Sequence, residues 1–208
     1  WDEKQSRADK HGSTEHNLAV AKKMLEIGMR REAKNILTKL ERKLNKKKRQ
    51  SLKDKTALFY ICRYLCQYYY SLKAEKQFRK YFKLVLKYFS FLRVRAKAGS
   101  YELSPDIMVH YYFCRSYKAT YNIKKMEELT TGRKYLEEAL CENEKIHTQG
   151  NDLLSQMINT RSELLMNIAN IYSSEPGGFE KAEKYAELGA KNAMDAGLEG
   201  DLCCFRIL

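Results

Sequence analysis

Apolar side chains recur along this chain at intervals of three and four residues. Near the C-terminus one stripe falls at i, i+3, i+4 and i+7, and a stripe of mostly small residues follows a Pro-Gly-Gly turn: Leu165, Ile168, Ala169 and Tyr172, then Ala182, Tyr185, Ala186 and Gly189. Such spacing places each set on one face of an α-helix. The pattern therefore predicts two amphipathic helices within Ser162–Asp201 that fold back on each other and pack closely.

The same spacing predicts three earlier helix hairpins. Gly28 is expected to end the first helix in a left-handed conformation, and Ser104 with Pro105 is expected to begin a later one. An insertion, Ala119–Thr131, is expected to delay the helix that follows. The four hairpins are expected over residues 14–44, 56–92, 105–146 and 151–197. Residues 1–13 are charged without periodicity and are expected to form a flexible lead-in.

One predicted helix separates aromatic from basic side chains. Within Lys76–Leu92 the inward positions are expected to be Phe78, Tyr81, Phe82, Val85, Leu86 and Phe89. The outward positions are expected to be Arg79, Lys80, Lys83 and Lys87. A second basic cluster, formed by Lys46, Lys47, Lys48 and Arg49, lies between the first two hairpins. The helical period thus predicts a basic outer face over an aromatic core.

The stripes resemble the tetratricopeptide (TPR) repeat, in which a large, a small and an aromatic residue mark the first helix and a small residue opens the contact face of the second. The first hairpin carries that family's spacing without a gap, at Val20, Ala21, Met24, Gly28, Ala33, Leu37 and Leu40. Aligned on the first position of the family's pattern, the hairpins start at Thr14, Phe59, Ile107 and Ser162, which are 45, 48 and 55 residues apart, against about 34 in the family. Phe78 stands where the family prefers a small residue. The resemblance implies an all-α fold: a right-handed superhelical α-solenoid of about four antiparallel hairpins, forming one domain over residues 14–208 within a longer array.

The resemblance also implies a concave groove lined by the first helix of each hairpin. The residues that it places in the groove are Lys22, Tyr60, Arg63, Gln67, Tyr70, Tyr111, Arg115 and Lys118. Aromatic rings bury much area, and guanidinium groups pair with carboxylate or phosphate, so both suit a binding wall. For Tyr60 and Tyr111, packing between helices is an equally good interpretation.

The net charge of +13 is unevenly distributed. Residues 1–100 hold 27 Lys and Arg against nine Asp and Glu, a net charge of +18, whereas residues 101–208 hold 12 against 17, a net charge of −5. A strongly basic half favours a polyanionic partner. The three candidate classes are an acidic peptide, a nucleic acid and an anionic lipid. The candidate contact residues of this basic patch are Lys46, Lys47, Lys48, Arg49, Arg79, Lys80, Lys83 and Lys87.

Sequence motifs of catalysis are missing from the chain. It contains no Gly-rich phosphate loop, GxSxG, HExxH or CxxC, so we expect no enzymatic activity and no cofactor. The i, i+4 spacing of Cys62 with Cys66 and of His110 with Cys114 leaves a zinc site as an alternative. Packing of cysteines as small apolar side chains explains them better, so no metal is expected. The scattered cysteines indicate a reducing, intracellular setting.

Together these features predict a non-catalytic scaffold or adaptor that binds an acidic or extended partner segment in the groove, as a component of a larger protein assembly. The alternative is sequence-tolerant binding of RNA or single-stranded nucleic acid by the basic N-terminal half. Against it, the aromatic and basic side chains of Lys76–Leu92 lie on opposite helix faces. The sequence contains no run of about 18 apolar residues that would predict a membrane span. The expected location is the cytoplasm; a cytoskeletal or ciliary assembly and the nucleus stay open.

Overall fold

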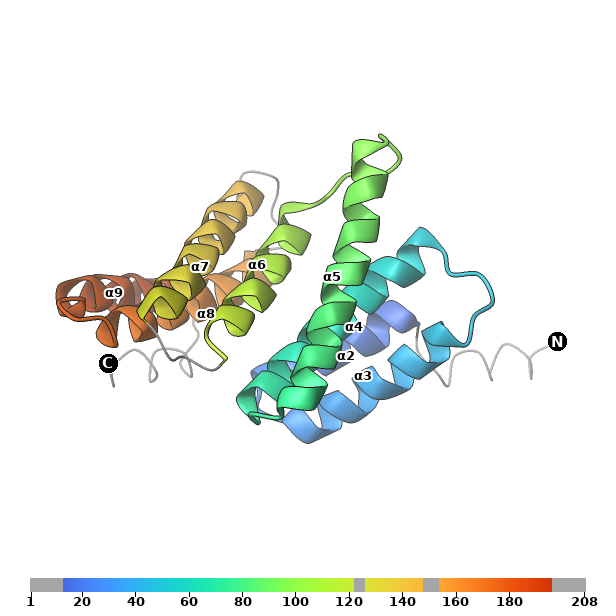
Figure 1. Ribbon diagram of the computed structural model, residues 1–208, viewed down its shortest axis with the longest axis horizontal. Helices are drawn as coiled ribbons and strands as arrows, with labels where there is room; N and C mark the ends of the chain where they lie inside the picture. The colour runs from blue at the N-terminus through green and yellow to red at the C-terminus, as the bar shows by residue number, and fades with distance from the viewer. Residues whose placement is uncertain (1–12, 122–125, 148–153, 196–208) are drawn as a thin grey trace. The chain divides into compact units, whose positions relative to one another are not determined.

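The computed structural model describes residues 13–121, 126–147 and 154–195, and throughout these residues the regular structure is helical, without a strand (Figure 1). The all-α class predicted from the periodicity is therefore confirmed. The chain divides into two compact units, Trp1–Glu102 and Leu103–Leu208, called unit 1 and unit 2 below. Each unit has its own helix packing and is described by itself.

Among its described residues, unit 1 has four helices, and each packs against the next: α2 (Thr14–Glu26), α3 (Arg30–Asn45), α4 (Leu52–Ser71) and α5 (Glu75–Lys97). The first helices of the two pairs, α2 and α4, also pack together. Apolar side chains from α3, α4 and α5 fill the interior, among them Leu37, Leu44, Leu58, Phe59, Leu65, Phe78, Val85 and Leu92. The amphipathic stripes of the sequence therefore point inward in this unit.

Local capping fixes where the helices of unit 1 begin and end. Ser51 and Asp54 form a reciprocal capping box at the start of α4, which satisfies backbone donors that a helix start leaves open. Gly28 has φ +81° after α2, so the predicted left-handed ending is confirmed. Lys73 takes the equivalent place after α4 with φ +53°.

The described part of unit 2 likewise has four helices: α6 (Pro105–Ala119), α7 (Met126–His147), α8 (Leu154–Ser173) and α9 (Phe179–Asp195). Each packs against its neighbour in the chain. Ser104 caps α6, whose first residue is Pro105, so the predicted start is confirmed. Leu165, Ala169 and Ala186 form a buried cluster between α8 and α9. The two C-terminal stripes therefore face each other as expected.

Two glycines allow the backbone of unit 2 to pack closely. A Cβ atom at Gly132 on α7 would lie 2.4 Å from Cγ2 of Thr120, just after α6. A Cβ atom at Gly178 would lie 2.1 Å from the carbonyl oxygen of Tyr172 on α8. The second contact is with backbone, which cannot rotate away as a side chain can. The Pro-Gly-Gly turn is therefore a position where a residue without a side chain is required.

Some element boundaries differ from the sequence-based expectation. Helix α5 continues to Lys97 although a loop was expected from Arg93, because no helix breaker occurs before Gly99. Helix α7 begins at Met126, inside the insertion expected over Ala119–Thr131, and two glutamates in its first turn favour that start. Both helices are therefore longer than the periodicity suggested. The superhelical array and its single-domain organisation stay predictions.

Candidate partner-binding surfaces

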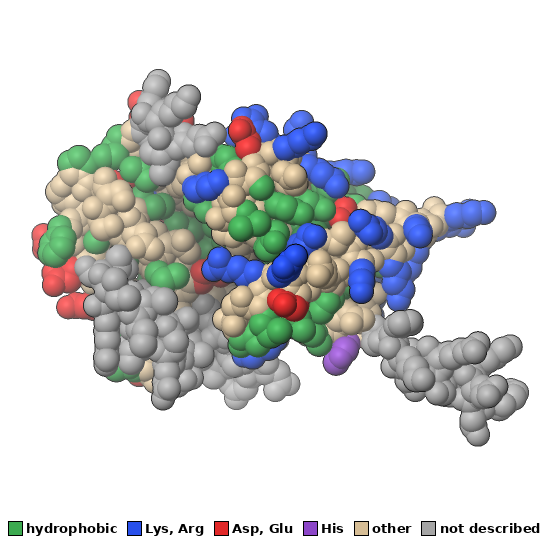
Figure 2. Space-filling model, turned by 90° about the horizontal axis from the view of Figure 1, so that it is seen from below, with side chains coloured by type: hydrophobic (Ala, Val, Ile, Leu, Met, Phe, Trp, Pro, Cys, Tyr) green, Lys and Arg blue, Asp and Glu red, His purple; other side chains and the backbone are tan. Residues whose placement is uncertain are grey.

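The exposed side of α5 carries a row of cations, which we call the α5 basic face: Arg79, Lys80, Lys83 and Lys87. All four side chains are exposed, and Figure 2 shows how Lys and Arg side chains gather on the part of the surface formed by unit 1. Arg79 is held by Glu75, whose Oε1 accepts a hydrogen bond from its Nε at 2.7 Å. Among the described residues the three lysines have no carboxylate within ion-pair distance. Their positive charge is therefore not balanced locally.

The basic loop, Lys46–Arg49, lies in the connection between α3 and α4, and its four side chains are exposed. Lys47 pairs with Asp54 at 2.6 Å, which lowers the pKa of that carboxyl group. The start of α4 reaches α5 through Lys55, whose Nζ lies 3.8 Å from the centre of the Phe91 ring. Phe91 follows Lys87 by one helical turn. The basic loop and the C-terminal half of α5 therefore belong to the same end of unit 1.

The opposite side of α5 is buried and aromatic, as the sequence predicted. Phe78, Tyr81 and Phe89 are buried, and the hydroxyl of Tyr81 donates a hydrogen bond to Oε2 of Glu41 on α3 at 3.0 Å. Burial, and after it the nearby Glu41 carboxylate, raises the pKa of Tyr81. Burial likewise raises the pKa of Tyr88 to about 12. These rings hold α5 on the unit and are not accessible to a partner.

Five predicted groove residues lie in unit 1, on α2 and α4, and their exposure differs. Lys22, Tyr60, Gln67 and Tyr70 are half-buried. Arg63 is 1% exposed, and its Nη1 donates to Oε1 of Gln67. A buried guanidinium group does not meet an incoming partner without rearrangement. The arginine on which the groove hypothesis depended most in this unit is therefore enclosed in the structure.

The other three predicted groove residues lie on α6 in unit 2. Lys118 is exposed, whereas Arg115 is bound within the unit: its Nη1 donates to the hydroxyl of Tyr111 at 2.8 Å, and its Nη2 donates to the hydroxyl of Tyr135 on α7. Its guanidinium carbon lies 4.6 Å from the Tyr135 ring centre. Burial alone would lower the pKa of Arg115, but the two tyrosine hydrogen bonds raise it. Arg115 therefore joins α6 to α7.

A second arginine network in unit 2 was missed by the sequence analysis. Nη1 of Arg133 donates to Oε1 of Glu137 at 2.9 Å and to the hydroxyl of Tyr172 at 2.8 Å, and its Nε donates to Oε1 of Glu175 at 3.2 Å. The Tyr172 ring stacks on Tyr185 of α9, with ring centres 5.6 Å apart. The network thus joins α7, α8 and α9. Only the i, i+4 pair Arg133 with Glu137 was visible in the sequence.

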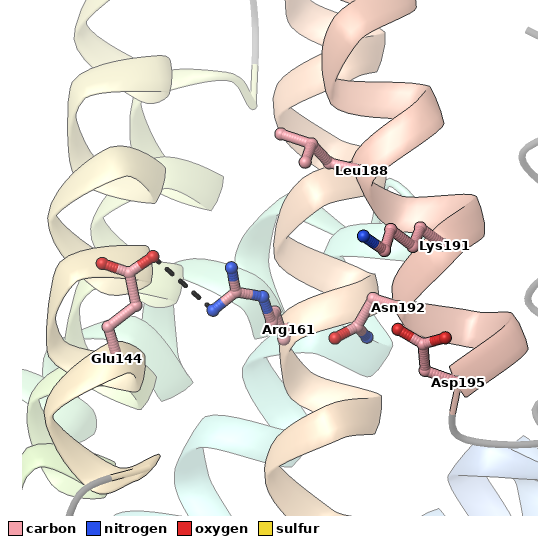
Figure 3. Close-up of a pocket in the computed structure, with 6 residues that line it drawn as sticks. All are labelled: Glu144, Arg161, Leu188, Lys191, Asn192 and Asp195. Atoms are coloured by element: carbon pink, nitrogen blue, oxygen red, sulfur yellow. Dashed lines mark ion pairs between the residues drawn. The ribbon is translucent and has the colours of Figure 1, made fainter.

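An open cleft of about 490 Å³ lies between the ends of α7, α8 and α9 (Figure 3). Its lining residues are Glu144, Arg161, Leu188, Lys191, Asn192 and Asp195. Arg161 and Glu144 face each other across it at 3.5 Å. The lining combines two carboxylates with two cations, so its charge does not select a ligand of either sign.

The four residues of the alternative zinc site lie in different units. Cys62 and Cys66 are buried on α4, whereas His110 and Cys114 are buried on α6. Nε2 of His110 lies 3.6 Å from Oδ1 of Asp106. In the part of the chain that the structure describes, no group of three or more His, Cys, Asp or Glu side chains is arranged to hold a metal ion.

Comparison of the chain with protein-family models, curated proteins and solved structures finds no match. The TPR resemblance therefore stays a prediction from the sequence. Among the described helices, none combines the length and the apolar character that crossing a membrane requires.

Proposed function

We propose that this protein is a non-catalytic scaffold or adaptor of the helical-repeat type, and that its α5 basic face and basic loop bind an acidic segment of a protein partner. The observation that carries the proposal is the row of Lys80, Lys83 and Lys87, which is exposed and, as far as the chain is described, has no carboxylate within ion-pair distance. Like charges one turn apart on a helix destabilise it slightly. The repulsion within this row of lysines gives no evident benefit for folding. An acidic partner would neutralise the positive charge of the row.

The packing of unit 1 supports a helical-repeat scaffold. Each helix contacts the next, and α2 also contacts α4, so successive pairs share one continuous interior. Arrays of this type present extended surfaces on which partners lie. The proposed contact lies on the outer face of α5 rather than in the predicted groove, because Arg63 is enclosed and Arg115 is bound to two tyrosines.

The distribution of aromatic rings favours an acidic protein segment over single-stranded nucleic acid. Stacking of bases on exposed aromatic side chains supplies much of the affinity for single strands. On α5 the rings of Phe78, Tyr81 and Phe89 are buried beneath the lysines. A nucleic acid on this face would therefore be held by its phosphates alone, with the steep salt dependence of such contacts.

The test is the binding of a fluorescein-labelled poly-glutamate peptide of about 20 residues, followed by fluorescence anisotropy at about 50 mM salt. A length-matched oligo-dT strand serves as the second probe. The variant K80E/K83E/K87E changes the α5 basic face. The matched variant K134E/K184E/K191E makes the same change in net charge at exposed lysines of unit 2. Circular dichroism checks that both variants keep their helix content.

We expect K80E/K83E/K87E to weaken peptide binding at least about tenfold and the unit 2 variant to weaken it less than about threefold. Equal losses in the two variants would mean that net charge alone attracts the peptide, and the assignment to α5 would be abandoned. Tighter binding of oligo-dT than of the peptide, persisting at about 200 mM salt, would favour the nucleic-acid function instead.

A further inference from the structure

Exposed apolar side chains of unit 1 concentrate in its two hairpin turns. Ile27 is 60% exposed and Met29 is also exposed in the turn between α2 and α3, and Leu72 is 56% exposed in the turn between α4 and α5. Exposed aliphatic side chains scattered singly need no explanation. An exposed apolar residue that recurs at the same structural position, as Ile27 and Leu72 do, does need an explanation.

The two turns have the same backbone design. After α2 the amide of Met29 donates to the carbonyl of Met24 at 2.8 Å, and that of Gly28 donates to Leu25 at 3.2 Å. After α4 the amide of Ala74 donates to Tyr69 at 3.0 Å, and that of Lys73 donates to Tyr70 at 3.0 Å. Both patterns are Schellman motifs, which end a helix with one left-handed residue.

Ile27 and Leu72 occupy the same position in the two motifs, directly before the left-handed residue. The motif is formed by backbone hydrogen bonds, so it does not require an apolar side chain there. Because α2 and α4 pack together and both lead into these turns, the turns lie at one end of unit 1 (Figure 1). This end, with Ile27, Met29 and Leu72, is called the apolar tip below.

Cations flank the apolar tip. Arg30 and Arg31 at the start of α3, and Lys76 at the start of α5, are exposed and have no carboxylate within ion-pair distance among the described residues. The neighbouring Glu26 pairs with Lys23, and Glu75 pairs with Arg79. Glu32, which also flanks a turn, is exposed and has no ion pair with another described residue. The surroundings of the tip are therefore basic.

We infer that the apolar tip inserts into the interface of an anionic lipid membrane, with Arg30, Arg31 and Lys76 on the lipid headgroups. Amphipathic peripheral contacts of this kind combine buried apolar side chains with electrostatic attraction to anionic lipids. The exposed area of Ile27, Met29 and Leu72 is on the order of 300 Å², well below the roughly 800 Å² per partner of a stable protein interface. A shallow lipid contact requires no such area.

Two other exposed apolar residues provide matched controls. Val94 on α5 is 65% exposed and lies between the exposed cations Arg93 and Arg95, but it stands on a helix away from the turns. Phe179 is 71% exposed at a turn of unit 2, with Glu175 and Glu180 nearby in the sequence. Val94 therefore tests whether any apolar residue among cations suffices, and Phe179 tests whether an apolar turn suffices without them.

The first experiment is co-sedimentation with phosphatidylcholine vesicles that contain about 30% phosphatidylserine, beside vesicles of phosphatidylcholine alone. We expect I27N/L72N to lower the partition coefficient on the anionic vesicles at least about tenfold, and V94N and F179N to change it less than about twofold. At about 500 mM salt the unsubstituted protein should retain a residual binding that I27N/L72N abolishes, because screening leaves the apolar contribution.

The second experiment measures membrane insertion directly by tryptophan fluorescence. It does not require I27N/L72N to fold. The chain has a single tryptophan, Trp1, so W1F/L72W places the only indole at the tip. We expect its emission to shift to shorter wavelength on adding anionic vesicles, whereas W1F/V94W should not shift. The K80E/K83E/K87E variant of the α5 basic face should keep the shift when added to W1F/L72W. This separates the lipid site from the proposed peptide site.

Several results would overturn the inference. One is equal binding of the unsubstituted protein to anionic and neutral vesicles; another is equal loss of binding in I27N/L72N and V94N. Absence of an emission shift in W1F/L72W would also exclude insertion. If sedimentation equilibrium showed a dimer that I27N/L72N dissociates, the tip would instead be a contact between two copies of this chain.

Discussion

The cations of the two units are used differently. In unit 1, Lys80, Lys83 and Lys87 are exposed on α5 and have no carboxylate neighbours among the described residues. In unit 2, Arg115 and Arg133 are hydrogen-bonded to tyrosines, and Arg133 also to two glutamates, across helix boundaries. The guanidinium groups of unit 2 therefore hold its helices together, whereas the ammonium groups on α5 stay accessible to a partner.

The chemistry of arginine and lysine explains why the cations of unit 2 are bound within the fold and those on α5 are exposed. A guanidinium group presents several donors in a fixed plane, so Arg133 on α7 can bond Tyr172 on α8 and Glu175 in the turn after it at the same time. A lysine ammonium group is a strongly hydrated point charge on a flexible stem and remains at the surface. Net charge alone would have described unit 1 only as more basic. The structure adds that Lys80, Lys83 and Lys87 are exposed on α5 and have no ion pair among the described residues.

The largest expected effect tests how tightly unit 2 is constrained. Gly178→Ala should lower the free energy of unfolding by about 3 kcal/mol or more, because the new Cβ would meet the Tyr172 carbonyl oxygen at 2.1 Å. In unit 1, Gly28→Ala meets no atom within 4 Å and should cost about 1 kcal/mol for its left-handed backbone. Urea denaturation followed by circular dichroism measures both; a Gly28 variant as damaging as the Gly178 variant would contradict the contrast.

A smaller effect is expected from the arginine network. Arg133→Met keeps much of the side-chain volume but removes the donors to Glu137, Tyr172 and Glu175. The free energy of unfolding should fall by about 2 kcal/mol, because partly buried acceptors lose their partner. The adjacent exposed Lys134→Met should change it by less than about 0.5 kcal/mol. Equal values for the two variants, again from urea curves, would show that the network does not stabilise unit 2.

The smallest effect has opposite signs in the two units. Lys83 has Arg79, Lys80 and Lys87 three or four residues away, so Lys83→Glu should raise the free energy of unfolding by about 0.5 kcal/mol. The same change in unit 2, Lys184→Glu, replaces favourable spacings to Glu180 and Glu187 with repulsive ones and should lower it by a similar amount, about 0.5 kcal/mol. Parallel thermal and urea unfolding of the two variants gives the comparison. A loss of stability in both would mean that the lysine row contributes to the fold.

Much of the helical layout followed from local patterns. The left-handed ending at Gly28, the start of α6 at Ser104 and Pro105, and the burial of Phe78, Tyr81 and Phe89 beneath an exposed basic face were all predicted. Each depends on residues within one or two helical turns. The C-terminal end of α5 and the start of α7 were placed wrongly because they depend on weak helix propensities. The spacing of the apolar residues does not reveal such propensities.

The candidate surfaces were less predictable. Arg63 and Arg115 have the composition of binding residues, but the structure encloses the first and binds the second to Tyr111 and Tyr135. The apolar tip was not recognised, because a single Ile or Leu at a helix end gives no periodic signal. The apolar tip exists only because two turns that are 45 residues apart in the chain lie together at one end of unit 1.

The sequence by itself therefore determined that the chain is helical, where several helices begin and end, which face of α5 is basic, and that positive charge gathers in the first half. These properties depend on the helical period and on composition, which are local or additive. Only the tertiary structure decided which cations are bound within the fold and which remain accessible. That distinction depends on contacts such as Arg133 with Glu175, 42 residues apart in the chain, which helix packing creates and no local pattern records.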